Sequence, residues 1–152
     1  LAFATASSES ALPKALENMR KLGVPDKIVS FVLPTGYTFN LDGTTLYLSL
    51  ASVFVAQAAG MDLTLGEQLM MVVTLMLTSK GVAGVARASL VILFATAATF
   101  NLPEWPIAAI LGVDAIMDMA RTAVNVLGNC LASVVVARWE GEFESEGTSD
   151  DF

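Results

Sequence analysis

The sequence of 152 residues contains no histidine and only one cysteine, Cys130. The lack of histidine removes imidazole-based metal binding and acid–base catalysis, and a single cysteine cannot form an internal disulfide. We interpret Cys130 as a packed thiol because it lies in an apolar segment. Charge is also scarce, since 15% of the residues are charged, whereas soluble domains carry about 25%. No basic stripe is present, so we expect no nucleic-acid partner, and no bound cofactor is indicated.

The few charges gather at the two ends of an apolar chain. Hydrophobic residues make up 55% of the sequence and the mean hydropathy is +0.65. Four of the eight basic residues fall in the first 27 positions, and six of the fifteen acidic residues fall in the last 13. This distribution is typical of a membrane domain with polar ends. We expect the acidic end to be a solvated tail.

The first half of the chain predicts one short helix and one interrupted span. Residues 9–21 have helical composition, with Ser7 and Ser8 as candidate N-caps, and Pro13 is tolerable there if it falls in the first turn. The apolar segment 28–39 is half of the roughly 20 residues that a bilayer span needs. The polar residues 40–44 follow, and the apolar pattern resumes over residues 46–59. We therefore expect a transmembrane helix that is broken near its middle.

The second half predicts a hairpin and a long helix. Two apolar stretches, 67–78 and 88–100, are each too short to cross a bilayer and are joined by small residues, which indicates a re-entrant hairpin. One helix is then expected from about Ile107 to Trp139.

The fold class that follows is an all-α membrane protein. The expected divisions are the end of a first, partial re-entrant hairpin (1–24), a broken transmembrane helix (25–60), a second re-entrant hairpin (61–102), a last transmembrane helix (103–140) and an acidic tail (141–152). The positive-inside rule places residues 14–27 and Arg138 in the cytoplasm, and the loops at 60–66 and 101–106 outside. We further expect the chain to be the C-terminal part of a longer protein.

The last helix carries the strongest functional pattern. Its polar residues recur at spacings of one, three or four and so share one face about 100° wide; they are Asp114, Asp118, Arg121, Thr122, Asn125 and Asn129. Charges cost about 2.5 kcal/mol or more near a bilayer centre unless they are paired or hydrated. The stripe therefore indicates an internal binding site, in which Arg121 suits a carboxylate and Asp118 an ammonium group. The alternatives are a stripe that only packs helices and a local Asp118–Arg121 salt bridge.

Three further segments are candidate binding elements. At 40–44, freed backbone carbonyls with Asn40 and Asp42 suit a small cation, the alternative being a structural kink. At 79–89, Gly81 and Gly84 allow backbone to approach a ligand. Lys80 there needs an anion or a carboxylate, unless it extends to the surface. The serines at 7–10 suit an anion at a helix N-terminus, unless they only cap the helix.

The order and the amino-acid sequences of these segments resemble those of a known family. Residues 40–44 read Asn-Leu-Asp-Gly-Thr, close to Asn-Met-Asp-Gly-Thr, and residues 114–125 combine Asp114, Asp118, Arg121, Thr122 and Asn125. With a hairpin between them, these motifs resemble the dicarboxylate/amino acid:cation symporters, which include the bacterial proton/glutamate symporters. The resemblance extends to about Phe143.

The resemblance implies a role for each segment. Arg121 would hold the side-chain carboxylate of an acidic amino acid and Asp118 its amino group. The remaining substrate contacts would be Ser7, Ser8, Thr44, Val85, Thr122 and Asn125. The positions concerned with cation binding or with coupling would be Glu9, Gly36, Asn40, Asp42, Lys80, Asp114, Asn125 and Asn129. The second hairpin would be the gate of a homotrimeric carrier in the plasma (inner) membrane, with a cytoplasmic C-terminus.

Departures from the family pattern concern the coupling ion. Sodium-coupled members carry an acid at the position of Asn129 and an uncharged residue at that of Lys80, so the resemblance implies proton coupling. Sodium, at Gly36, Asn40, Asp42 and Asn125, is the alternative. Candidate proton carriers are Glu9, Asp42, Asp114 and Asp118, and Arg87 is an unusual charge at the second hairpin tip.

The presence of Asp118 favours glutamate or aspartate as the substrate, with C4-dicarboxylates such as succinate as the alternative.

Other classes of protein fit the sequence less well. An intramembrane aspartyl protease would use buried acids such as Asp42, but its Gly-x-Gly-Asp pattern is missing and Arg121 would pair with the acid it needs. A passive channel fits less well than an occluding carrier, because broken helices that end at a midplane site are typical of carriers. A soluble helical domain is the third rival.

Overall fold

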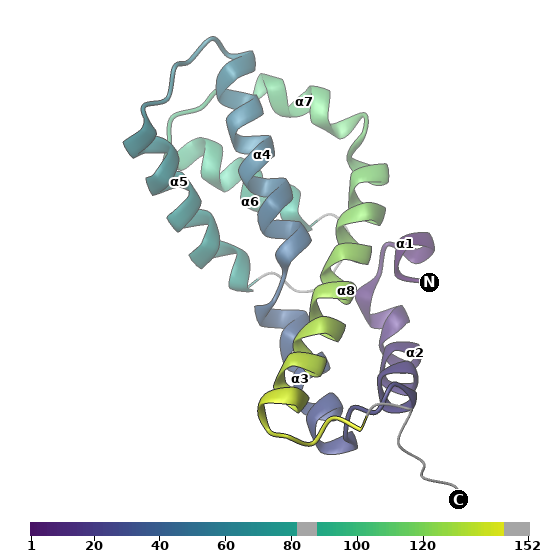
Figure 1. The fold of residues 1–152 in the computed structure, drawn as a ribbon. Coiled ribbons are helices and arrows are strands. Elements are labelled where there is room, and N and C mark those ends of the chain that lie inside the picture. Colours follow the sequence, from purple (N-terminus) through teal and green to yellow (C-terminus); the bar gives the residue numbers. More distant parts are fainter. Residues whose placement is uncertain (82–87, 145–152) are drawn as a thin grey trace, which may run out of the picture.

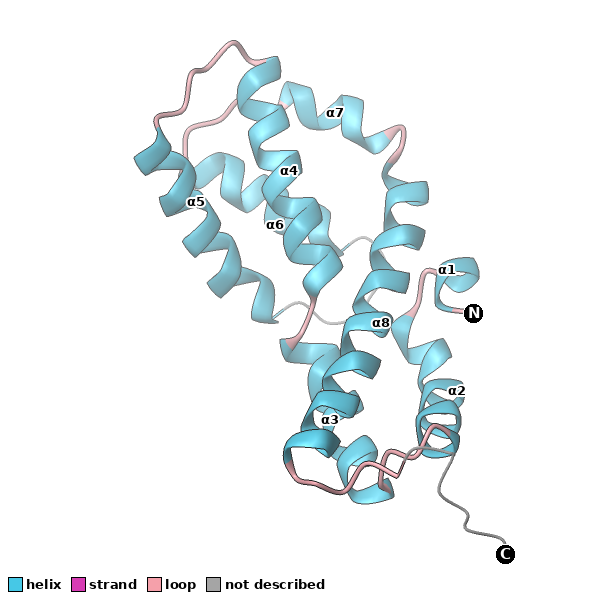
Figure 2. Ribbon diagram, viewed as in Figure 1, coloured by secondary structure: helices cyan, strands magenta, loops and turns pink. Residues whose placement is uncertain are grey.

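The computed structural model describes residues 1–81 and 88–144, and within these ranges the chain is helical without strands (Figures 1 and 2). The all-α prediction is therefore confirmed. The helices are α1 (Ala2–Thr5), α2 (Ser8–Lys21), α3 (Asp26–Phe39), α4 (Asp42–Ala58), α5 (Leu65–Thr78), the 3-10 turn η1 (Ser79–Gly81), α6 (Ala88–Thr99), α7 (Trp105–Leu111) and α8 (Asp114–Trp139). Val85 and Arg87 lie outside the described residues.

A tight turn joins α1 to α2. Ala6 adopts a left-handed conformation with φ 47°, and the Ser7 hydroxyl accepts a hydrogen bond from the Ser10 backbone N–H at 3.3 Å. This confirms Ser7 as the N-cap. Pro13 lies inside α2 and not in its first turn, where its missing N–H would do least harm. Gly23, with φ 97°, follows the helix and reverses the chain, a conformation that favours glycine.

The predicted break separates α3 from α4. Asn40 and Leu41 leave helical geometry, with ψ values of 78° and 64°. The Asn40 backbone N–H still bonds to the Gly36 carbonyl at 2.7 Å, and the Thr45 N–H bonds to the Leu41 carbonyl at 2.9 Å. The interruption is therefore confined to two residues, and α4 already begins at Asp42.

Helices α5 and α6 run back against each other beside α4 (Figure 1). A capping box starts α5: Glu67 accepts the Thr64 backbone N–H at 2.8 Å while the Thr64 hydroxyl accepts the Glu67 N–H at 3.3 Å. Sequence periodicity predicted both helices within two residues of their bounds.

The last predicted helix is in fact two. Residues Gly112 and Val113 separate α7 from α8, so the uninterrupted helix expected from about Ile107 is wrong in this respect. Leu111, Gly112 and Val113 are exposed. Gly112 and Asp114 are residues that commonly end and begin helices, but no proline marks this point. The bend places α7 across the end of α4 (Figure 1).

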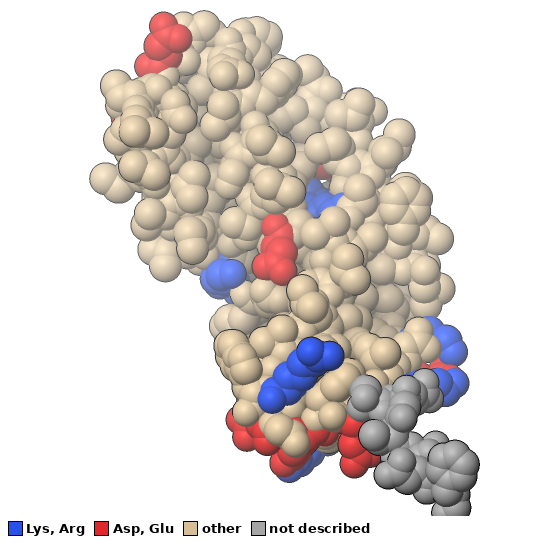
Figure 3. Space-filling view, in the orientation of Figure 1, with Lys and Arg blue, Asp and Glu red and all other residues tan. Residues whose placement is uncertain are grey.

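Two apolar cores stabilise the fold. The α4–α7 core is formed by side chains of α4, α5, α6 and α7, and includes Leu48, Leu75 and Ile107. The α2–α8 core joins α2, α3 and the end of α8, and includes Val29, Leu33 and Ala137. Within the described residues, α8 is the one helix long and apolar enough to span a membrane by itself. Charged side chains gather mainly at the end of the molecule formed by α2, α3 and the end of α8 (Figure 3).

Candidate functional site

Helix α8 turns its polar stripe inward. All six predicted stripe residues are buried: Asp114, Asp118, Arg121, Thr122, Asn125 and Asn129. The opposite face carries large exposed apolar side chains, among them Ile116, Val124 and Leu127. This arrangement is the reverse of an amphipathic helix on a soluble protein and matches a helix whose outer face meets lipid or another apolar surface.

Asn125 closes the N-terminal end of α4. Its side-chain oxygen accepts the backbone N–H groups of Gly43 at 2.8 Å and Thr44 at 3.2 Å. Its amide nitrogen donates to the Thr44 hydroxyl at 2.9 Å. The first amides of a helix have no partner within the helix, so this one side chain satisfies two of them and joins α8 to the break.

Asn129, one turn further along α8, contacts the other side of the break. Its amide nitrogen donates to the carbonyls of Asn40 at 3.2 Å and Asn125 at 2.9 Å. Its oxygen accepts from the Asn40 side chain at 3.2 Å. Gly36 is needed beside it, because a Cβ at that position would overlap the Asn129 side chain. Of the residues predicted to take part in cation binding or coupling, Gly36, Asn40, Asn125 and Asn129 are thus brought together.

Arg121 is buried among polar groups and one aromatic ring. It is 6% exposed, and its Nη2 group forms an ion pair with Asp118. The guanidinium lies 4.5 Å from the centre of the Tyr47 ring, within cation–π range. Its Nη1 group has no hydrogen-bond partner in the described part of the chain. The local Asp118–Arg121 pair, an alternative in the sequence, is therefore formed, and it leaves part of the guanidinium fork open.

Tyr47 is the site residue that the sequence analysis missed. Its hydroxyl donates to Asp114 at 3.0 Å while its ring faces Arg121. It lies three residues after Thr44 on α4, and this spacing places both side chains on one face. That spacing places Tyr47 on the same face as Thr44, but its contacts with Asp114 and Arg121 depend on α4 meeting α8.

The other predicted residues are more dispersed. Asp42 is exposed, and its carboxylate lies against Gly128, where a Cβ would overlap it. Lys80 donates from η1 to the Phe39 carbonyl at 2.9 Å. Ser8 is buried in the first turn of α2, which packs on α8, whereas Glu9 is exposed there. No group of three or more metal-ligating His, Cys, Asp or Glu side chains occurs in residues 1–81 and 88–144.

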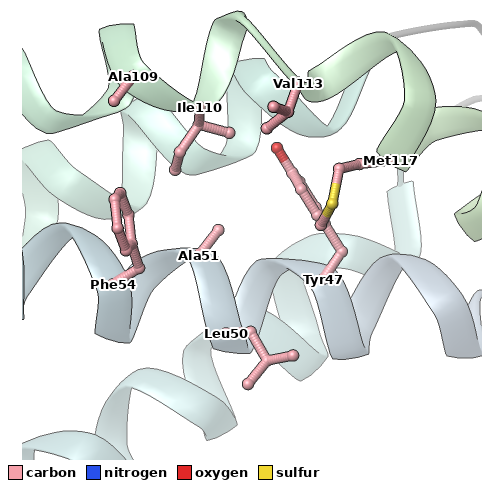
Figure 4. A pocket seen from close by; sticks show the side chains of 8 residues that line it. All are labelled: Tyr47, Leu50, Ala51, Phe54, Ala109, Ile110, Val113 and Met117. Carbon is pink, nitrogen blue, oxygen red and sulfur yellow. The ribbon is translucent and has the colours of Figure 1, made fainter.

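An apolar pocket adjoins the polar region. It has a volume of about 240 Å³ and lies between α4 and the α7–α8 bend. Figure 4 shows Tyr47 and Met117 at one end of this pocket and Phe54 at the other. The pocket offers contact area and one hydroxyl, that of Tyr47, and it lacks the donors that a carboxylate needs.

The sequence matches a family model over most of its length. The model of the sodium:dicarboxylate symporter family covers residues 1–139. The chain belongs to the sodium:dicarboxylate symporter family. This membership confirms the family resemblance seen in the sequence and assigns the chain to a family of membrane symporters.

Curated members of the sodium:dicarboxylate symporter family are similar over nearly the whole chain. A proton/sodium-glutamate symport protein of Bacillus caldotenax is 51% identical over 146 residues, which cover 96% of this chain and 35% of the relative. A proton/glutamate-aspartate symporter of Escherichia coli is 54% identical over 144 residues, or 95% and 33%. A C4-dicarboxylate transport protein of Laribacter hongkongensis is 46% identical over 147 residues, or 96% and 33%. The chain spans about a third of the length of these relatives.

Proposed function

We propose that this chain forms the substrate- and ion-binding part of a secondary active symporter for acidic amino acids, glutamate or aspartate, driven by protons. The observation that carries the proposal is the Arg121 guanidinium, buried beside Asp118 with Nη1 lacking a hydrogen-bond partner in the described residues. A buried guanidinium with an open donor group is suited to a substrate carboxylate, which it binds by charge-assisted hydrogen bonds.

Asp118 is proposed to select an amino acid over a simple dicarboxylate. A carboxylate one turn from Arg121 is suited to an ammonium group, whereas it would repel the second carboxylate of succinate. Relatives are named for glutamate, for glutamate and aspartate, and for C4-dicarboxylates. A C4-dicarboxylate symporter is therefore the second candidate, favoured by those last names alone.

The remaining contacts of the site are proposed from their position. Thr44, Thr122 and Asn125 would bind the polar ends of the substrate, together with Ser7, Ser8 and the backbone at Val85. Glu9, Asp42, Asp114 and Asp118 are the candidate proton carriers. If sodium is the coupling ion, Gly36, Asn40, Asp42 and Asn125 are its candidate site.

The proposed membrane arrangement follows the divisions expected from the sequence. Residues 1–24 would be the end of a first, partial re-entrant hairpin, and 61–102 a second re-entrant hairpin that acts as the gate. Residues 25–60 would form the broken transmembrane helix and 103–140 the last transmembrane helix. The many exposed apolar side chains, such as Phe31, Leu77 and Leu127, support contact with lipid or with other parts of the whole protein. We propose a homotrimer in the plasma (inner) membrane with residues 141–152 in the cytoplasm.

The test is uptake of labelled glutamate by the full-length protein in liposomes, under a proton gradient with and without sodium. Uptake driven by the proton gradient alone is expected. Uptake of succinate but not glutamate would favour the second candidate, and a strict sodium requirement would refute coupling to protons alone. An Asp118→Asn variant should lose glutamate uptake more than succinate uptake, because only the amino acid needs that carboxylate.

A further inference from the structure

The last carbonyls of α3 are met by side chains from two other elements. The Phe39 carbonyl accepts a hydrogen bond from Lys80 Nζ at 2.9 Å. The Asn40 carbonyl accepts one from the Asn129 amide at 3.2 Å. The final carbonyls of a helix have no partner within the helix, so in an apolar environment such groups need outside donors.

The two sides of the break receive partners of opposite character. The N-terminal amides of α4 meet the neutral oxygen of Asn125. The C-terminal carbonyls of α3, where a helix carries a partial negative charge of about half an electron, meet a full positive charge on Lys80. Carbonyls at the ends of broken membrane helices commonly coordinate small cations. Here a side-chain ammonium donates to one such carbonyl, that of Phe39, and a side-chain amide donates to the next, that of Asn40.

Lys80 differs from the other lysines of the chain. Lys14 and Lys21 form ion pairs with Glu17, and Lys27 forms one with Glu142. In the described residues Lys80 forms no ion pair, and its only hydrogen bond joins η1 to α3. Within the described residues the Lys80 ammonium group therefore has a backbone carbonyl as its partner, as a bound cation would, although it is attached to η1.

We infer that Lys80 is a tethered cation, which neutralises the C-terminal end of α3 in place of an alkali cation from solution. The positive charge is then supplied by η1 itself, and no sodium ion is needed at this end of the break. The inference rests on the proposed function and deepens it, since it names the residue that sets the ion requirement of the site.

The test removes the charge from Lys80 in the full-length protein. Lys80→Gln keeps a donor for the Phe39 carbonyl but has no charge, and Lys80→Met lacks both. We expect sodium chloride, compared with choline chloride, to raise the Tm of these variants in detergent by roughly 2 °C or more, because an ion that binds only the folded state stabilises it. The wild type and Lys27→Gln, which removes an exposed lysine, should show no such rise.

Uptake in liposomes supplies the second readout. Glutamate uptake by Lys80→Gln should be several-fold higher with sodium than with choline. Uptake by the wild type should be the same with either cation. The inference would be overturned if sodium changed the Tm and the glutamate uptake of the wild type and of both Lys80 variants to the same extent. It would also be overturned if sodium changed them in none of the three proteins. The Tm measurement requires no transport, so a wild type that takes up neither glutamate nor succinate would refute the proposed function and still leave the role of Lys80 decided.

Discussion

The α4–α7 core and the crossing of α8 with the break are held together in different ways. In the core, buried apolar side chains such as Leu48, Leu75 and Ile107 pack between helices. At the crossing, Asn125 and Asn129 join α8 to backbone groups of α3 and α4. Apolar packing is non-directional, whereas each hydrogen bond fixes a donor and an acceptor. The crossing can therefore hold a charged group in one geometry, and the core cannot.

This difference predicts different consequences of mutation. A large-to-small change in a core removes contacts and leaves a cavity, which lowers the free energy of unfolding. A change at the crossing leaves buried polar groups without partners, and it also alters the groups that face the substrate. Measurements of both stability and substrate affinity on each variant therefore separate the two regions.

The largest effect on affinity is expected for Arg121→Gln. Truncating one partner of a buried charge pair costs about 2–5 kcal/mol, so the Kd for glutamate should rise by at least roughly thirty-fold. The matched control is Arg138→Gln, near the end of the same helix, where the arginine is exposed. Equilibrium binding of labelled glutamate to the full-length protein measures both, and equal affinities would refute the role of Arg121.

The largest effect on stability is expected for Leu75→Ala in the α4–α7 core. Leu75 is fully buried, and such a substitution costs about 2–5 kcal/mol. Thermal unfolding in detergent should show the loss, while the Kd for glutamate of the folded fraction should stay within a factor of about two. Leu77→Ala, two residues away and largely exposed, is the control. A large change in the affinity of Leu75→Ala for glutamate would contradict the distinction between the core and the crossing.

Gly43→Ala should damage both properties to an intermediate degree. A Cβ at Gly43 would lie 2.5 Å from the Arg121 backbone carbonyl and 3.0 Å from a Val124 side-chain carbon, so α4 and α8 must move apart. Overpacking of this kind costs about 1–3 kcal/mol. Gly66→Ala is the control, because a Cβ there meets nothing within 4 Å. Wild-type Tm and affinity in Gly43→Ala would show that the close approach of α4 and α8 is not required.

The smallest of these effects is expected for Tyr47→Phe. The substitution keeps the ring beside Arg121 and removes the hydroxyl that donates to Asp114. Loss of one buried hydrogen bond costs about 1 kcal/mol, so the affinity for glutamate should fall by less than about ten-fold. Tyr47→Leu, which also removes the ring, should lower it further. If the two variants bind glutamate equally, the aromatic ring does not help to hold Arg121.

Local patterns predicted much of this architecture from the sequence. The Ser7 cap, the break after Phe39 and the buried stripe of α8 each depend on residues close together along the chain, so spacing alone identifies them. The bend at Gly112 was not predicted, although Gly112 and Asp114 are residues that commonly end and begin helices. Nor was Tyr47 identified, because its role depends on α4 and α8 meeting in space. The contact of Lys80 with the Phe39 carbonyl was not predicted either, because the two residues lie on different helices.

The most direct test of the account is an experimental structure of the full-length protein with glutamate bound. We predict that a substrate carboxylate lies within hydrogen-bond distance of the Arg121 guanidinium, and that the amino group faces Asp118, between α8 and the α3–α4 break. Glutamate bound elsewhere, with Arg121 still facing only Asp118 and Tyr47, would contradict the central claim.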